Sequence, residues 1–394
     1  MLSFNMEQLK QQFEEVFATS ADRSFFAPGR INLIGEHTDY NGGHVFPCAI
    51  TFGTYGLVKK REDDLIRVYS LNFEEIGIVT FPVTDETYEA SHDWANYVKG
   101  VVTLLRKDGH DLNGFDFFLA GNIPNGAGLS SSASLELVTA YMLNEVYGLG
   151  LERLDLVRLG QRVENTFIGV NSGIMDQFAI GMGKAGQAML LDCETLHHDY
   201  APIVLDGYDI VIMNTNKRRE LADSKYNERR RECDTALGLI QPKCEVNSLG
   251  QLSMETFEQV ALDLPETLRK RARHAVSENE RTILAYTALQ EGRLETFGQL
   301  MNASHASLRD DYEVTGIELD MLVSAAQGCD GVIGARMTGA GFGGCAIAIV
   351  RQDKTGSMIQ ETSDRYVSTI GHAPTCYVAS VGDGVRELVE EEVK

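Results

Sequence analysis

The sequence predicts an α+β protein with two domains, and three observations support this prediction. The chain has 394 residues, which exceeds the size at which a single hydrophobic core keeps growing. Strand-like and helical patterns are mixed, without the strict alternation that a parallel βαβ sheet requires. Hydrophobic content of 43% and charged content of 23% are ordinary for a folded globular chain.

The first half of the chain opens with a helix and continues with strands. Apolar residues recur at helical spacing from Met6 to Phe17, which predicts an amphipathic helix. Short runs rich in β-branched and aromatic residues, bounded by Gly, Asp or Asn, predict strands over 49–58, 66–71, 77–83 and 114–119. A period near 3.6 residues then predicts helices over 129–147, over 154–167 and from about residue 174.

A different pattern begins near residue 186. We therefore expect one domain over residues 1–185 and a second over 186–394. In the second part, strands are predicted over 188–191, 208–213, 344–350 and 375–381, and several long charged helices between residues 222 and 326. The chain contains no internal repeat and no low-complexity tract.

Charge and cysteine usage exclude some classes of protein. The formal net charge of −22 argues against nucleic acid as the main partner, because phosphate backbones are bound by clustered Lys and Arg. Seven cysteines without a Cys-x-x-Cys pair fit a reducing compartment better than a disulfide framework. There is no basic segment followed by an apolar run at the N-terminus, and no apolar stretch of membrane-spanning length. We expect a cytoplasmic location.

Residues 28–43, PGRINLIGEHTDYNGG, combine an arginine, a glutamate, a histidine, an aspartate and four glycines. Glu36, His37 and Asp39 supply hydrogen-bond donors and acceptors within four positions, and glycines let the backbone approach a ligand closely. This mixture is typical of a site that orients a polyhydroxylated molecule. A solvated turn between two strands is the alternative. A metal site is disfavoured, because these three residues do not share the spacing of zinc ligands.

Residues 124–134, PNGAGLSSSAS, form a glycine-rich turn between a predicted strand and a predicted helix. The unpaired N–H groups and the positive dipole end at a helix start favour phosphate oxygens. No lysine follows the glycines, so this is not a Walker A loop. Another cation must offset the phosphate charge, and we expect Mg²⁺, which needs few hard oxygen ligands from the protein.

Together with residues 334–344, GARMTGAGFGG, these segments resemble the three motifs of the GHMP family of small-molecule kinases, in the family order. The first segment resembles the signature of the galactokinases within that family. Residues 94–100, WANYVKG, and 175–178, MDQF, continue the resemblance, which covers essentially the whole chain. It implies a two-domain GHMP kinase fold, with a ribosomal-protein-S5-like N-terminal domain and a ferredoxin-like C-terminal domain.

The resemblance also implies an activity: transfer of the ATP γ-phosphate to the anomeric hydroxyl of galactose, giving galactose 1-phosphate and ADP for galactose metabolism. A kinase for a related sugar such as N-acetylgalactosamine is one alternative. A non-catalytic galactose and ATP sensor of the same family is another, although such proteins tend to have a damaged phosphate loop. We expect a monomer whose partners are galactose and ATP, with no nucleic acid or membrane partner.

Individual roles follow from the same resemblance. Asp176 matches the family's proposed base, and Arg30 can pair with it and stabilise charge on the transferring phosphoryl group. Ser132 and Glu164 match the Mg²⁺ ligands; a helix cap and a solvated helix residue are their alternatives, and Glu136 and Glu152 are other carboxylates within reach. The sugar is expected to contact Glu36, His37, Thr38, Asp39, Gly173 and Tyr226. The nucleotide is expected to contact Ser70, Trp94, Tyr97, Gly126, Ala127, Gly128, Leu129, Ser130, Ser131 and Ser132.

Overall fold

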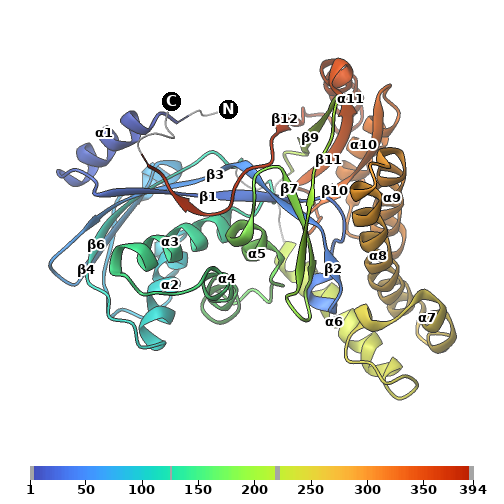
Figure 1. Cartoon of the computed structure of the whole chain (residues 1–394), viewed down its shortest axis with the longest axis horizontal. Helices are drawn as coiled ribbons and strands as arrows, with labels where there is room; N and C mark the ends of the chain where they lie inside the picture. Colours follow the sequence, from blue (N-terminus) through green and yellow to red (C-terminus); the bar gives the residue numbers. More distant parts are fainter. Residues whose placement is uncertain (1–3, 125–126, 218–221, 390–394) are drawn as a thin grey trace.

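The computed structural model describes residues 4–124, 127–217 and 222–389. Figure 1 shows two main sheets, one formed mostly by the first half of the chain and one by the second half, with helices packed against both. The strands and helices are mixed without βαβ alternation, so the predicted α+β class is confirmed.

The first sheet has six strands in the order β13-β1-β3-β6-β4-β5. Neighbours are antiparallel except β4 and β6, which are parallel. The strands are β1 (Arg23–Asn32), β3 (Pro47–Lys60), β4 (Leu65–Ser70), β5 (Val79–Pro82), β6 (Phe115–Gly121) and β13 (Arg386–Glu387). The four strands predicted in this half are confirmed as β3 to β6. Strand β1, which no sequence pattern predicted, forms the centre of the functional region.

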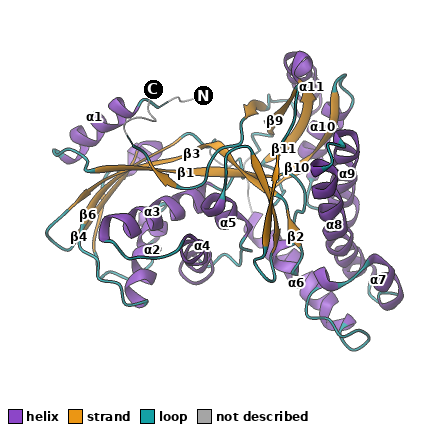
Figure 2. Cartoon of the chain, viewed as in Figure 1, coloured by secondary structure: helices purple, strands orange, loops and turns teal. Residues whose placement is uncertain are grey.

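Helices cover both faces of this sheet (Figure 2). On one face lie α2 (Ala95–Lys107), α3 (Ser131–Tyr147), α4 (Arg153–Arg162) and α5 (Met175–Met182). On the other face lies α1 (Met6–Phe17), where Leu9 and Phe13 are fully buried against β3 and β6. The predicted first helix is therefore confirmed. The helix predicted over 154–167 divides into α4 and a π-helical turn, Val163–Ile168, which carries Glu164.

The second main sheet has the order β10-β11-β9-β12, with all neighbours antiparallel. Along the chain it reads β9, helices, β10, β11, helix, β12, which is the ferredoxin-like arrangement expected for this half. Its strands are β9 (Tyr208–Asn214), β10 (Val332–Thr338), β11 (Cys345–Arg351) and β12 (Thr375–Ala379), and its helices are α6 (Ala222–Ile240), α7 (Met254–Val260), α8 (Glu266–Gln290), α9 (Leu294–Ser307), α10 (Gly316–Gln327) and α11 (Thr355–Ile370).

Strand β11 connects the two halves because both of its faces are buried. Ala346, Ala348 and Val350 pack with the helices of the second half. The alternate residues Cys345, Ile347 and Ile349 pack against a cluster that includes Ile31 and Phe46 from the first half. A small third sheet, formed by β2 (His44–Val45), β7 (Gln187–Asp192) and β8 (His198–Pro202), lies between them. The boundary at residue 186 stays a prediction.

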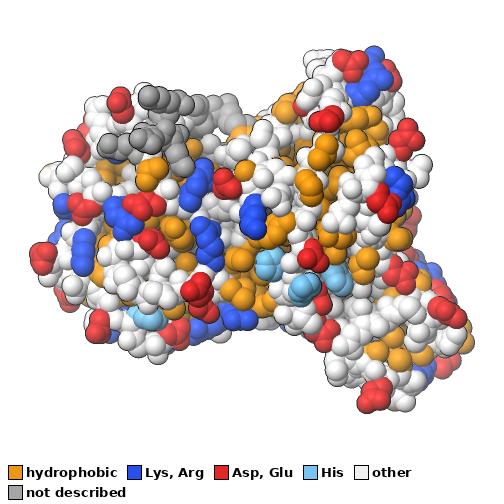
Figure 3. Space-filling model, in the orientation of Figure 1, with side chains coloured by type: hydrophobic (Ala, Val, Ile, Leu, Met, Phe, Trp, Pro, Cys, Tyr) orange, Lys and Arg blue, Asp and Glu red, His pale blue; other side chains and the backbone are white. Residues whose placement is uncertain are grey.

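The surface carries charges of both signs. On the face drawn in Figure 3, acidic and basic side chains are interspersed, and α7 and the end of α6 project as a lobe. All seven cysteines are unpaired. In the part of the chain that the structure describes, no helix combines the length and apolar character needed to cross a bilayer.

Candidate active site

A partly buried ion pair between Arg30 and Asp176 lies at the centre of the site. Arg30 Nε donates to Asp176 Oδ1 at 2.8 Å, and Nη2 donates to Oδ2 at 3.0 Å. The Arg30 side chain is only 5% exposed, whereas Asp176 is 31% exposed and lies in the first turn of α5. A bidentate pair of this kind holds both side chains in one orientation. The structure therefore brings together the two residues expected to carry the chemistry, 146 positions apart in sequence.

Two local features of the backbone direct the Arg30 side chain toward Asp176. The register between β1 and β3 shifts between Pro28 and Arg30. A Cβ on Gly29 would lie 2.7 Å from the carbonyl oxygen of Leu129, so only glycine permits the close approach of β1 to the glycine-rich turn. Pro28 and Gly29 interrupt the strand pattern in the sequence, which explains why β1 was not predicted.

A cavity opens in front of the Arg30–Asp176 pair. Five of the six residues predicted to contact a sugar line it: Glu36, His37, Asp39, Gly173 and Tyr226. The sixth, Thr38, is fully buried and donates its hydroxyl to the carbonyl oxygens of Gly35 and His44. Glu164, predicted as a metal ligand, also lines this cavity. Five other lining residues were given no role in the sequence analysis: Val170, Ser172, Met175, Gly339 and Ala340. Gly339 and Ala340 belong to the third motif, and that motif was the sequence signal from which they could have been predicted.

Glu36 is held from behind by the third motif. Its Oε1 accepts hydrogen bonds from Gly339 N at 2.7 Å and from Arg336 Nη1 at 3.3 Å. Burial raises the pKa of Glu36, while the Arg336 charge opposes that shift. Arg336 is fully buried and also lies 3.6 Å from a carboxylate oxygen of Glu278 on α8. Arg336 lies in the third motif, but the sequence analysis assigned it no role in the site.

His37 is a neutral imidazole that joins two parts of the site. Its Nε2 donates to the carbonyl oxygen of Ala340 at 3.1 Å, so Nδ1 accepts from the Tyr40 hydroxyl at 2.8 Å. Burial lowers the pKa of His37 to about 3. Both ring nitrogens are therefore engaged within the protein.

Asp39, Gly173 and Tyr226 also line the first cavity. A Cβ on Gly173 would lie 1.8 Å from Asp39 Oδ2 and 2.4 Å from its Cγ, so the carboxylate occupies the space that any side chain would need. Burial, followed by the charge of Asp176, raises the pKa of Asp39 to about 7. Burial also raises the pKa of the Tyr226 hydroxyl well above its usual value. Asp39 thus sits close to the point where it can either accept or donate a hydrogen bond at neutral pH.

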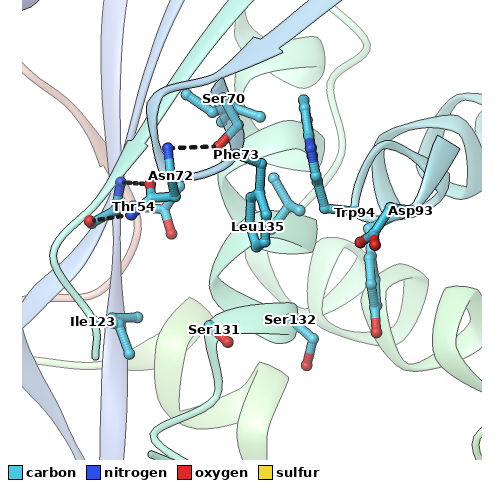
Figure 4. Close-up of a pocket in the computed structure, with 13 residues that line it drawn as sticks. Thr54, Ser70, Asn72, Phe73, Asp93, Trp94, Ile123, Ser131, Ser132 and Leu135 are labelled. Atoms are coloured by element: carbon cyan, nitrogen blue, oxygen red, sulfur yellow. Dashed lines mark hydrogen bonds between the residues drawn. The ribbon is translucent and has the colours of Figure 1, made fainter. Parts of the chain in front are cut away.

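A second cavity lies next to the first and is mainly apolar at one end (Figure 4). Its lining includes five residues predicted to contact a nucleotide: Ser70, Trp94, Tyr97, Ser131 and Ser132. The Trp94 ring stacks on Phe73 with centroids 6.4 Å apart and an interplanar angle of 19°. In Figure 4, Trp94, Phe73 and Leu135 lie above the two serines, so the cavity offers aromatic and aliphatic surface at one end and hydroxyl groups at the other. Phe73 and Leu135 were not predicted.

The glycine-rich turn supplies backbone contacts to the ion pair. Gly128 O accepts from Arg30 Nη1 at 2.8 Å, and Leu129 O accepts from Arg30 N at 3.2 Å. Ala127 and Leu129 are buried, and α3 begins at Ser131. Gly126, also predicted as a nucleotide contact, lies outside the described residues.

Ser132 and Glu164 connect the two cavities. Ser132 lines the second cavity, Glu164 lines the first, and Ser132 Oγ donates to Glu164 Oε1 at 2.9 Å. Burial raises the pKa of Glu164. One hydroxyl and one carboxylate at this separation suit Mg²⁺, which keeps most of its ligands as water and phosphate oxygens. Within the described residues there is no group of three or more His, Cys, Asp or Glu that could hold a metal ion.

The other two carboxylates considered for this role lie elsewhere. Glu152 is the exposed N-cap of α4 and takes part in a capping box with Asp155. Glu136 is fully buried on α3, where its Oε2 accepts from Gln177 Nε2 at 3.0 Å. Burial, reinforced by the charge of Glu164, raises the pKa of Glu136 well above its usual range. Neither carboxylate is a hydrogen-bond partner of Ser132 in the described structure.

Three family models match the chain. The GHMP kinases N terminal domain matches residues 96–184, and the GHMP kinases C terminal model matches residues 285–366. The galactokinase galactose-binding signature matches residues 11–60, which contain the first motif.

Similar proteins cover nearly the full length. The galactokinase of Exiguobacterium sibiricum is 61% identical over 388 residues, which is 98% of this chain and 99% of that protein. The galactokinase of Ligilactobacillus salivarius is 56% identical over 382 residues, or 96% and 99% of the two chains. The crystal structure of Lactococcus lactis galactokinase complexed with galactose has a TM-score of 0.95 at 50% identity, covering 97% of this chain and all of that one.

A crystal structure of mevalonate kinase, at a TM-score of 0.64 and 18% identity, shares the fold alone. The expected two-domain GHMP kinase fold and the resemblance to galactokinases are confirmed. With such identity over such coverage, the chain belongs to the galactokinase family of GHMP kinases.

Proposed function

We propose that the protein transfers the γ-phosphoryl group of ATP to the anomeric hydroxyl of galactose, giving galactose 1-phosphate and ADP. One observation carries this proposal. The Ser132–Glu164 hydrogen bond joins two cavities. One is lined by polar side chains that can bind sugar hydroxyls, and the other is lined by Trp94 and Phe73. A nucleotide whose base occupies the aromatic end would direct its phosphates toward the serines and onward to the sugar cavity.

Asp176 is the group we assign as acceptor of the sugar proton. It is the partly exposed carboxylate in the wall of the sugar cavity, in the first turn of α5. The anomeric oxygen forms a new bond to the γ-phosphorus while its proton passes to Asp176. The bond between the γ-phosphorus and the bridging oxygen breaks, and ADP leaves with that electron pair.

Arg30 has two roles in this proposal. Its bidentate contact fixes the plane of the Asp176 carboxylate, and its permanent positive charge lies beside the region where the phosphoryl group crosses. A preorganised cation in a water-poor site stabilises charge that spreads over the transferring group. The sugar would be oriented by the Glu36 and Asp39 carboxylates and the Tyr226 hydroxyl, since all three residues line the cavity.

Mg²⁺ fits the residues between the cavities. Ser132 Oγ and a Glu164 oxygen would be its protein ligands, and their separation of 2.9 Å allows both to reach one ion. When bound, Mg²⁺ neutralises charge on the β- and γ-phosphates. We expect Ser132→Ala and Glu164→Gln to raise the Mg²⁺ concentration needed for half-maximal activity.

The test is a coupled assay of ADP formation with ATP and a panel of sugars that includes galactose and N-acetylgalactosamine. Galactose should give the highest kcat/KM, and the Asp176→Asn variant should fold normally and lose most sugar-dependent ADP formation. Faster phosphorylation of another sugar would overturn the galactose assignment. Near-normal turnover by Asp176→Asn would overturn the role of Asp176 while leaving the reaction itself in place.

A further inference from the structure

The hydroxyl of Ser130 points at Asp176. Ser130 lies in the glycine-rich turn, where a contact with nucleotide phosphates was expected. Its Oγ instead donates to Asp176 Oδ2 at 2.5 Å, and the residue is 6% exposed. Ser130 occupies the N-cap position of α3, but its side chain makes no capping hydrogen bond. The hydroxyl therefore has a different role from the usual N-cap serine.

The backbone of Ser130 adopts an unfavourable conformation. Its φ of 63° and ψ of 48° lie in the left-handed region, which residues other than glycine rarely occupy. Glycine would accept these angles without strain. A serine at this position is thus best explained by its hydroxyl, and the strain indicates that the contact with Asp176 matters.

Counting donors around the carboxylate identifies which oxygen remains available. Among the described residues, Asp176 Oδ2 accepts from Arg30 Nη2 at 3.0 Å and from Ser130 Oγ, whereas Oδ1 accepts only from Arg30 Nε at 2.8 Å. A carboxylate offers about two lone-pair positions on each oxygen. Both positions on Oδ2 are occupied, so the open position is on Oδ1.

We propose that Ser130 is a positioning residue for Asp176, which saturates Oδ2 and leaves Oδ1 as the oxygen that receives the proton of the sugar hydroxyl. The inference rests on the proposed function. The same turn also binds Arg30 through the carbonyl oxygens of Gly128 and Leu129. The phosphate-binding turn and the Arg30–Asp176 pair consequently form one hydrogen-bonded unit, and the turn orients the base as well as the nucleotide.

The test compares Ser130→Ala and Ser130→Gly with the wild-type protein, using Ser357→Ala on the exposed surface of α11 as a control. ADP formation gives kcat and the galactose KM. Nucleotide affinity is measured with ADP through the fluorescence of Trp94, the single tryptophan, which lines the nucleotide cavity. Thermal unfolding checks that each variant is folded. Because glycine relieves the backbone strain, Ser130→Gly keeps the test available if Ser130→Ala does not fold.

We expect kcat to fall roughly ten- to hundredfold in both variants, the usual effect of losing a hydrogen bond to a charged group. The galactose KM and the ADP affinity should stay within about twofold, since the residues that contact either ligand are unchanged. A kcat within about twofold of wild type, or recovery of kcat in Ser130→Gly alone, would overturn the proposal. A parallel loss of ADP affinity would also overturn it, by assigning the hydroxyl to the phosphates. Wild-type turnover of galactose in the same assay tests the proposed function separately.

Discussion

Replacing Gly173 with alanine tests the geometry of the sugar cavity by adding one carbon atom. The new Cβ would lie 1.8 Å from Asp39 Oδ2, 2.4 Å from Cγ and 3.0 Å from Cβ. Rotating the carboxylate about its last bond cannot relieve contacts with all three atoms, so the whole Asp39 side chain must move. Gly173 does not have a left-handed φ, so the collision with Asp39, and not backbone strain, opposes alanine.

The size of the effect follows from what Asp39 would lose. A hydrogen bond to a charged group contributes about 1.5–3 kcal/mol, and every 1.4 kcal/mol or so changes an affinity about tenfold. Displacing Asp39 from the cavity should therefore weaken galactose binding roughly ten- to hundredfold. The free energy of unfolding should fall by no more than about 1–3 kcal/mol, the usual cost of overpacking.

Isothermal titration calorimetry measures the affinity for galactose, and denaturant titration measures the free energy of unfolding. Gly356→Ala is the matched control, because a Cβ at this exposed position in α11 meets no atom within 4 Å. The control should bind galactose as the wild type does. ADP affinity, followed by Trp94 fluorescence, should be unchanged in both variants. If Gly173→Ala binds galactose with wild-type affinity, Asp39 does not contact the sugar from its position in this structure.

Three further predictions concern buried charges. Arg336→Met should lower the free energy of unfolding by about 3–5 kcal/mol in denaturant titrations, because two buried carboxylates lose their shared cation; a loss below about 1 kcal/mol would contradict this. Since the pKa of Asp39 is raised to about 7, its carboxylate form grows through neutral pH, and the galactose KM should fall between about pH 6 and pH 8. Asp39→Asn should remove this pH dependence of the galactose KM, and a wild-type KM that does not change with pH would refute the prediction. The pKa of Glu136 is higher in the folded protein than in the unfolded chain. The protonated side chain therefore contributes its full stabilisation at pH values below the unfolded pKa, and this stabilisation is lost as the pH rises through the folded pKa. Glu136→Gln keeps a hydrogen bond with Gln177 and cannot ionise, so its melting temperature relative to wild type should increase from about pH 5 to about pH 8; a constant difference would argue against the shift.

The fold was largely predictable because its signals are local. Helical periodicity identified α1 and α3, and β-branched runs bounded by turn residues identified β3 to β6. The exceptions have physical causes. Strand β1 contains Pro28 and Gly29, which interrupt any strand pattern, but the shift in register at that point aims Arg30 into the cavity. The sequence of β11 predicted a buried strand, yet periodicity could not show that alternate residues enter two different cores.

The candidate site divides in the same way. The residue types and spacing in the three motifs, together with the resemblance to GHMP kinases, predicted eight of the thirteen residues that line the first cavity, including Arg30, Asp176 and Glu164, and five of the thirteen that line the second, including Ser132. No local pattern could predict that His37 would use both ring nitrogens within the protein, or that Phe73 would stack on Trp94. These contacts depend on which surfaces meet after folding.

The sequence by itself determined the fold class, the family and the chemical groups available for phosphoryl transfer, since these depend on short-range patterns of side-chain type. Only the tertiary structure decided how those groups are oriented. Arg336 reaches Glu36 across 300 positions, and Ser130 reaches Asp176 across 46. Such pairs form because two sheets and their helices pack around shared cores, and the energy that fixes them comes from long-range packing and burial.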